Sequence, residues 1–182
     1  MTNFIHNFDA SILLFIKNNM HNSLIDKLMI FFTSLGNAGT VWIVSALALL
    51  INKRTRKAGY TVVIALLLGY IFGDCILKNI VHRLRPCTYI LQSQLLISKP
   101  AGYSFPSGHS GSSFAAAGVI SKYFKKTSIG VYIVAFLIAF SRLYLYVHYP
   151  TDVLAGIVLG IICSRVAIYI VCIKDYRREC SK

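Results

Sequence analysis

Residues 58–77 read AGYTVVIALLLGYIFGDCIL, an apolar run whose only charged side chain is Asp74. A helix needs roughly 20 predominantly apolar residues to cross the hydrocarbon core of a bilayer. Three later segments have the same character, namely Ser107 to Phe124, Ser128 to Val147 and Val153 to Ile173. The sequence therefore predicts four membrane-spanning helices from residue 58 onward.

The first third of the chain is less regular. Leu28 to Ile51 is apolar but contains four residues that disfavour a continuous helix: Ser34, Gly36, Asn37 and Gly39. This segment fits either one bent crossing or a hairpin of two short helices. Before it, Phe4 to Lys17 places its apolar residues largely on one helical face, which is typical of a helix in the membrane interface. We therefore expect an all-α fold: a polytopic membrane bundle of five to six transmembrane helices plus an N-terminal interfacial amphipathic helix, in a single domain covering 1–182.

The composition agrees with a membrane class. Of 182 residues, 56% are hydrophobic and the mean hydropathy is +0.64, which is too apolar for a water-soluble domain. The net charge of +13 comes from 19 Lys and Arg against 6 Asp and Glu. These basic residues cluster in breaks between apolar runs rather than on a polar body, so we expect no nucleic-acid partner. The five cysteines show no spacing typical of a metal site.

The basic clusters also predict topology. They occupy residues 53–57, 122–126 and 174–182, and they alternate with the other connections across the four spans. Cytoplasmic loops of membrane proteins are enriched in Lys and Arg. We therefore expect a multi-pass cell-membrane protein whose 78–105 and 147–152 connections lie on the non-cytoplasmic side.

That side carries charged residues in three ordered stretches. The first is KNIVHRLRP at 78–86, with Lys78 and Arg85 seven residues apart. The second is PSGH at 106–109, and the third is SRLYLYVHYPTD at 141–152, which contains Arg142, His148 and Asp152. Charges near membrane depth are costly and usually functional.

These residue types suit binding of a phosphate group. Lys78 and Arg85 are two helical turns apart, so they are expected to project from one face as an anion clamp. Pro106 suits the first turn of a helix, and Ser107, Gly108 and His109 then present free N–H groups at its positive end. Arg142 can hold two phosphate oxygens at once.

Two histidines remain for proton transfer and nucleophilic attack, and His suits both roles near neutral pH. Pro150 is expected to begin the last helix, with His148 just before it and Asp152 in its first turn. A carboxylate so placed can accept a hydrogen bond from one imidazole nitrogen and leave the other free to attack phosphorus.

The three stretches are similar to the motifs KxxxxxxRP, PSGH and SRxxxxxHxxxD of the type-2 phosphatidic acid phosphatase superfamily. The resemblance implies that His148 is a nucleophile forming a phosphohistidine, that Asp152 orients it and that His109 protonates the leaving group. Lys78, Arg85, Ser107, Gly108 and Arg142 would hold the phosphate. It implies neither a metal nor another cofactor, and the two carboxylates expected near this face, Asp74 and Asp152, are few for a Mg²⁺ site.

The resemblance also implies the reaction class. The layout is most similar to bacterial undecaprenyl-diphosphate phosphatases, which implies hydrolysis of undecaprenyl diphosphate to undecaprenyl phosphate at the outer face of the membrane. Phosphatidylglycerophosphate or phosphatidate phosphatase, and a lipid-linked phosphotransferase, remain alternatives. The expected partners are a lipid phosphate and the bilayer. No feature of the sequence indicates the oligomeric state.

Neighbours of the motifs have two interpretations each. Asp74 lies four residues before Lys78, so an ion pair is expected, serving either to position Lys78 or only to compensate its charge. His82 and Arg83 are interpreted as a solvated loop pair, with contact to the second phosphate of a diphosphate as the competing hypothesis.

Overall fold

The chain folds into helices joined by short connections. The structure, a computed structural model, describes the backbone of residues 2–180 and the side chains of residues 4–173, and this part of the chain contains no strand. Its α-helices are α1 Thr2–Asn19, α2 Ser23–Gly36, α3 Thr40–Ile51, α4 Arg56–Gly69, α5 Lys78–Val81, α6 Gly108–Tyr123, α7 Ser128–Tyr144 and α8 Pro150–Cys180. Shorter turns of 3-10 or π geometry are η1 Asn37–Gly39, η2 Tyr70–Leu77, η3 Pro86–Tyr89, η4 Gln92–Gln94 and η5 Lys125–Thr127.

Within the described residues, four helical segments are long and apolar enough to cross a membrane. They are Ser23–Ile51, Arg56–Val81, Lys125–Tyr144 and Pro150–Ile173. Large apolar side chains such as Ile129, Leu154 and Val158 are exposed along them, as a lipid-facing surface requires. The predicted all-helical membrane bundle is confirmed, but the predicted span Ser107 to Phe124 is not among these four segments, because its helix, α6, has only 16 residues.

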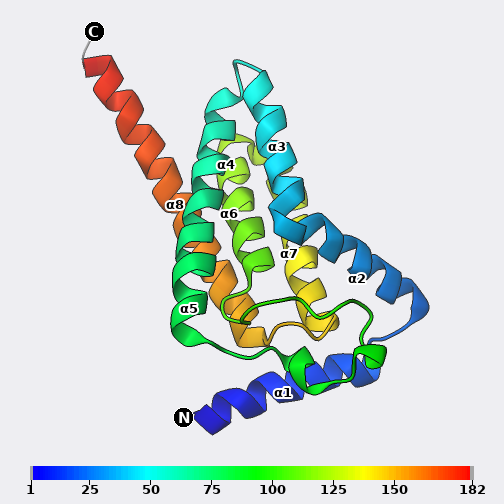
Figure 1. The fold of residues 1–182 in the computed structure, drawn as a ribbon. Coiled ribbons are helices and arrows are strands. Elements are labelled where there is room, and N and C mark those ends of the chain that lie inside the picture. The colour runs from blue at the N-terminus through cyan, green and yellow to red at the C-terminus, as the bar shows by residue number, and fades with distance from the viewer. Residues whose placement is uncertain (1, 181–182) are drawn as a thin grey trace.

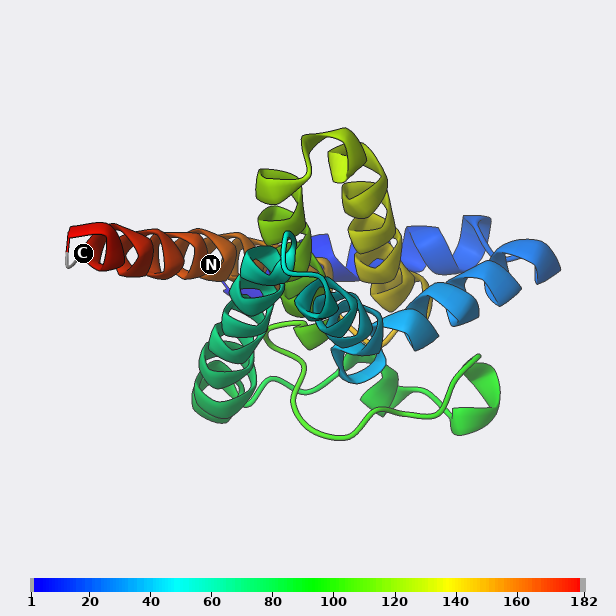
Figure 2. The ribbon, with the colours of Figure 1, turned by 90° about the horizontal axis from the view of Figure 1, so that it is seen from above.

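Helix α6 is only 16 residues long and lies among the other helices. It packs against α4, α7 and α8, which stand around it when the bundle is seen from above (Figure 2). Small residues allow this close approach: a Cβ on Gly160 of α8 would lie 2.4 Å from the carbonyl oxygen of Gly111. The glycines of α6 and α8 therefore set the central helix contact.

The first crossing is bent rather than folded back. Helices α2 and α3 follow one another along a single path that turns at η1 (Figure 1). Ala38 and Gly39 have φ values of 50° and 68° there, so the α-helical hydrogen bonding is interrupted for one turn. Of the two arrangements left open by the sequence, the structure has the single bent segment and not the hairpin.

Helix α1 lies across the end of the bundle, at a large angle to the crossings (Figure 1). Leu13 and Ile16 are buried on its inner face, whereas Phe4, Phe8 and Phe15 are exposed on its outer face. A helix with one apolar face on the protein and another outward fits a position in the membrane interface.

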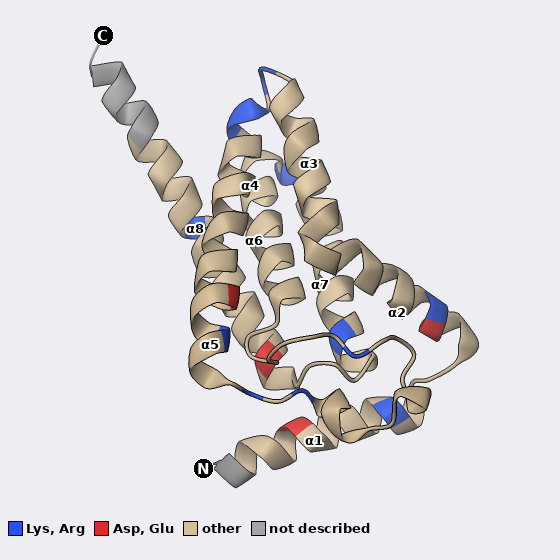
Figure 3. Ribbon diagram, viewed as in Figure 1, with Lys and Arg blue, Asp and Glu red and all other residues tan. Residues whose placement is uncertain are grey.

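The basic connections lie far from α1. Lys53 and Arg54 lie in the loop between α3 and α4, at the opposite end of the bundle from α1 (Figure 3). Lys125 and Lys126 lie in η5, at that same distant end. The third predicted cluster, 174–182, lies outside the residues whose side chains are described.

Candidate active site

A cavity of about 680 Å³ enters the bundle between the kink of the first crossing and the start of α6. Seven of the eight predicted site residues line it: Lys78, Arg85, Ser107, Gly108, His109, Arg142 and His148. The eighth, Asp152, is fully buried behind His148. The three distant motifs therefore meet at one end of the molecule.

His148 lies in the connection between α7 and α8, and its side chain is only 2% exposed. Its Nε2 is 2.8 Å from Nη1 of Arg85, which also donates to the carbonyl oxygen of Val147 at 3.1 Å. Because a guanidinium can only donate, Nε2 accepts this bond and carries the ring's lone pair. The lone pair of His148 therefore points toward the cations of the cavity.

The other ring nitrogen reaches Asp152 through a serine. Nδ1 of His148 is 3.3 Å from Oγ of Ser104, and that hydroxyl donates to Oδ2 of Asp152 at 2.5 Å. The direct distance from Nδ1 to Oδ2 is 3.7 Å, beyond hydrogen-bond range. Asp152 does lie in the first turn of α8, as predicted, but Ser104 stands between it and the imidazole. Sequence reasoning missed Ser104.

The protonation of His148 follows from these surroundings. Burial, together with the nearby positive charges of Arg85 and Arg142, lowers the pKa of His148 to about 3, although Asp152 opposes the shift. The imidazole is therefore neutral at physiological pH, with its proton on Nδ1. A neutral imidazole with a free lone pair is the form that acts as a nucleophile.

Arg142 contributes a second buried guanidinium from the last turn of α7. It is 3% exposed, and its Nη1 donates to Oγ1 of Thr33 on α2. Its Nε is buried and has no hydrogen-bond partner among the described residues. An unpaired buried donor on a residue that lines the cavity is available to a hydrogen-bond acceptor that enters it.

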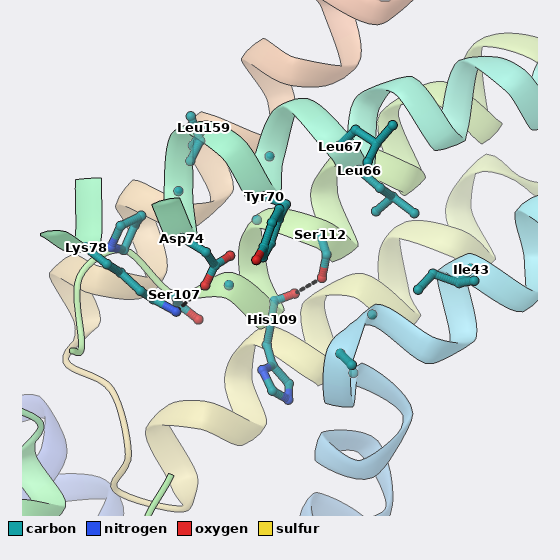
Figure 4. A pocket seen from close by; sticks show the side chains of 18 of the residues that line it. Ile43, Leu66, Leu67, Tyr70, Asp74, Lys78, Ser107, His109, Ser112 and Leu159 are labelled. Carbon is teal, nitrogen blue, oxygen red and sulfur yellow. Dashed lines mark hydrogen bonds and ion pairs between the residues drawn. The ribbon is translucent and has the colours of Figure 1, made fainter. Parts of the chain in front are cut away.

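Lys78 and Asp74 form the predicted ion pair at the mouth of the cavity (Figure 4). A Cβ on Gly108 would lie 3.4 Å from both carboxylate oxygens of Asp74 and 3.8 Å from Nζ of Lys78. The absence of a side chain at Gly108 therefore keeps the space between the helix start and Lys78 open.

The clamp geometry expected for Lys78 and Arg85 is wrong, although both residues reach the cavity. The helix ends at Val81 because His82 adopts a left-handed conformation with φ of 50°. Arg85 is therefore extended backbone, not the second turn of a helix. Its guanidinium is fixed instead by the carbonyl oxygens of Gly102 and Val147, at 3.0 and 3.1 Å.

The start of α6 also differs in detail from the prediction. Ser107 is the N-cap, so Pro106 precedes the helix rather than lying in its first turn. The amide of Ser107 is not free, because it donates to the carbonyl oxygen of Asp152 at 3.0 Å. The amides of Gly108 and His109 are the first of the helix and have no intrahelical acceptor. The positive end of α6 is thus directed at the cavity.

His109 sits where α6 meets the kink of the first crossing. Its Nε2 is 3.1 Å from Oδ1 of Asn37, and a Cβ on Gly36 would lie 2.6 Å from the imidazole. The bend between α2 and α3 therefore holds the ring of His109 in place. Its polar contact comes from Asn37, a residue that the sequence identified only as one that disfavours a continuous helix.

Arg83 is not a solvated loop residue, nor is it directed at the cavity. Its Nη1 donates to Oδ1 of Asp152 at 2.7 Å, and its Nη2 donates to Oδ2 of Asp9 at 2.6 Å. The guanidinium lies 4.0 Å from the ring centre of Tyr149. The expected solvated position is wrong for Arg83, because two buried carboxylates bind its guanidinium, whereas its neighbour His82 is exposed as expected. Contact with a second phosphate stays a hypothesis.

Asp9 places a further carboxylate close to Asp152, where the sequence indicated only Asp74 and Asp152. Within the described residues, no group of three or more His, Cys, Asp or Glu side chains has an arrangement that could hold a metal ion. Asp9 and Asp152 are instead joined by Arg83.

The chain is similar to several known proteins. The PAP2 superfamily model matches residues 58–175. An undecaprenyl-diphosphatase of Sulfolobus acidocaldarius is 36% identical over 140 residues, which cover 75% of this chain and 66% of that protein. A lipid A 4'-phosphatase of Bacteroides thetaiotaomicron is 31% identical over 178 residues, covering 88% of this chain and 75% of that protein.

A solved structure shares the architecture. The crystal structure of Aquifex aeolicus LpxE superimposes with a TM-score of 0.75 at 27% identity, covering 89% of this chain and 95% of that one. The matched fold, the family model and the named phosphatase relatives agree with the three motifs found in the sequence. The chain therefore belongs to the PAP2 superfamily, among its membrane-embedded phosphatases.

Proposed function

We propose that this phosphatase hydrolyses a lipid phosphate through a phosphohistidine formed on Nε2 of His148. The observation that carries the proposal is the 2.8 Å contact between that nitrogen and Nη1 of Arg85 inside a cavity that Lys78 and Arg142 also line. A phosphate that accepts hydrogen bonds from Arg85 would replace this contact and bring phosphorus to the released lone pair.

The cations and the start of α6 would then stabilise the transition state. Charge spreads over the equatorial oxygens of a phosphoryl group in transfer, and donors aimed at those oxygens lower the barrier most. Lys78, Arg85, Arg142, the Ser107 hydroxyl and the Gly108 amide supply such donors in this proposal. Removing one donor of this kind typically costs about 100- to 1000-fold in kcat.

Two steps complete the reaction. In the first, Nε2 of His148 bonds to phosphorus, the bond to the leaving oxygen breaks, and His109 gives that oxygen a proton. In the second, water attacks phosphorus, His109 accepts a proton from it, and the bond between phosphorus and nitrogen breaks to release phosphate. Asp152, through Ser104, would stabilise the positive charge that develops on the imidazole.

The rest of the cavity supports a lipid substrate. Beyond Asp74 and His109 its walls are apolar side chains of α3 and α4, including Ile43, Leu66 and Leu67 (Figure 4). A headgroup phosphate could thus bind at the polar end while the first part of an apolar tail contacts these walls.

We propose undecaprenyl diphosphate as the substrate, on the strength of the Sulfolobus relative that bears that name. Phosphatidylglycerophosphate and phosphatidate are the alternatives, and transfer to an acceptor other than water is the alternative reaction.

We further propose that the cavity opens on the non-cytoplasmic side, because the described basic loops lie at the other end of the bundle (Figure 3). Two single-cysteine variants, Lys53→Cys and Lys99→Cys, would test this when intact cells are treated with a membrane-impermeant maleimide. The cysteine at position 99 should be labelled and the one at position 53 should not.

One assay tests the chemistry. Purified protein in detergent with EDTA is given undecaprenyl diphosphate, phosphatidylglycerophosphate, phosphatidate and a lipid A, beside His148→Ala and the control His6→Ala, an exposed position on α1. We expect free phosphate from wild type and from the control, and none from His148→Ala. Activity that survives His148→Ala, or phosphate recovered on an alcohol acceptor instead of in solution, would contradict the proposed reaction.

A further inference from the structure

Helix α1 places a carboxylate inside the protein. Asp9 is fully buried, although it belongs to an otherwise largely exposed helix outside the residues matched by the family model. Its Oδ1 accepts from the amide of Thr151 at 3.0 Å, and its Oδ2 accepts from the hydroxyl of Thr151 at 2.6 Å and from Arg83 at 2.6 Å. Asp9 thus binds the first turn of α8 directly.

Arg83 connects this carboxylate to the proposed catalytic histidine. Its two terminal nitrogens bind different carboxylates: Nη2 donates to Asp9 at 2.6 Å, and Nη1 donates to Asp152 at 2.7 Å. Asp152 in turn receives the Ser104 hydroxyl that contacts His148. A continuous chain of hydrogen bonds therefore runs from α1 to the imidazole.

We propose that Asp9 is a positioning residue for phosphoryl transfer, acting through Arg83 on Asp152 and so on His148; the inference rests on the proposed role of His148. Two carboxylates share one guanidinium, so the buried group carries one net negative charge. Attack by Nε2 leaves positive charge on the ring, and this net charge stabilises it. Without the charge of Asp9, Arg83 would neutralise Asp152 and remove that stabilisation.

Asp9 also fixes the orientation of Asp152. Because Oδ1 of Asp152 is held by Arg83, Oδ2 remains directed at Ser104 and at the amide of Tyr149, at 2.5 and 2.9 Å. An Arg83 no longer held by Asp9 is free to shift across the carboxylate and turn it. A purely structural role, as an anchor of α1, would instead affect stability alone. Leu13 and Ile16 are buried on the inner face of α1, so we expect this helix to stay in place when only the charge of Asp9 is removed.

The test compares Asp9→Asn, Arg83→Ala and the double variant with wild type, in detergent, with a lipid phosphate that wild type hydrolyses. Asn7→Ala, an exposed position on the same helix, is the control. We expect Asp9→Asn to lower kcat by up to about 100-fold, the loss typical of an ångström-scale displacement at a reacting group. KM should stay within about threefold, since the cavity donors are untouched. Tm is measured for every variant.

The double variant shows whether Asp9 acts on kcat through Arg83. If Asp9 acts through Arg83, its removal adds little to the loss in Arg83→Ala, because residues of one network are not additive. Wild-type kcat in Asp9→Asn, losses that multiply in the double variant, or a loss of kcat that follows the loss of Tm would each overturn the inference. The proposed function fails separately, when His148→Ala retains activity.

Discussion

Ser104→Ala tests the connection between His148 and Asp152. The variant removes a hydroxyl that lies 3.3 Å from the imidazole and 2.5 Å from the carboxylate, and leaves those two groups 3.7 Å apart. The N–H at Nδ1 then has no acceptor within hydrogen-bond range, and an unsatisfied buried donor costs about 1–3 kcal/mol. Where that cost falls on the transition state for attack, kcat falls about 5- to 150-fold, since each 1.36 kcal/mol is tenfold.

The assay is phosphate release under saturating substrate, with kcat and KM determined for Ser104→Ala and Ser104→Thr. We expect threonine, which keeps a hydroxyl, to recover part of the lost rate. Ser45→Ala is the control, because its hydroxyl donates to the carbonyl oxygen of Val41 within its own helix, α3, at 2.7 Å. Wild-type kcat in Ser104→Ala would refute the bridge, and so would equal losses in the alanine and threonine variants.

Three further predictions concern stability and pH. The pKa of His148 is about 3 in the folded protein and near 6.5 in the unfolded chain, so the unfolded chain binds more protons between these two pH values. Tm should therefore fall as the pH is lowered from about 6.5, and His148→Gln should flatten that dependence. Gly160→Ala should destabilise the protein by about 1–3 kcal/mol in thermal denaturation, because the added Cβ would lie 2.4 Å from a backbone oxygen of α6. Gly130→Ala, which has open space around it, should be neutral or slightly stabilising. Equal effects of the two substitutions would contradict the packing of α8 on α6. If His148 is neutral and His109 protonated in the substrate complex, kcat, which reports the groups of that complex, should have a bell-shaped pH profile, and a kcat unchanged from acid to alkaline pH would count against these roles.

The residues that meet in the cavity were predictable because each motif combines residue types and spacings that have no joint structural reason. The local geometry was not. α5 ends where His82 adopts a left-handed conformation, and the sequence has no glycine or asparagine at that position to predict it. The prediction that Lys78 and Arg85 lie two turns apart on one helix was therefore wrong. The bend at residues 37–39 was visible as helix-breaking residues, but its contact with His109 depends on packing between α2 and α6.

Ser104 and Asp9 had no usable signal in the sequence. Ser104 lies in a connection without periodicity, and its role appears only when α6 and α8 bring His148 and Asp152 to either side of it. Asp9 looks like a polar interruption of an amphipathic helix. Only the placement of α1 across the start of α8 makes it a buried partner of Arg83.

Formation of a covalent phosphohistidine tests the central claim most directly. Wild type mixed with substrate, quenched rapidly in alkali and analysed by peptide mass spectrometry, should carry a phosphoryl group on the peptide containing His148, at a level that rises and decays within turnover. Turnover with no phosphoryl group on His148 at any quench time would contradict the account.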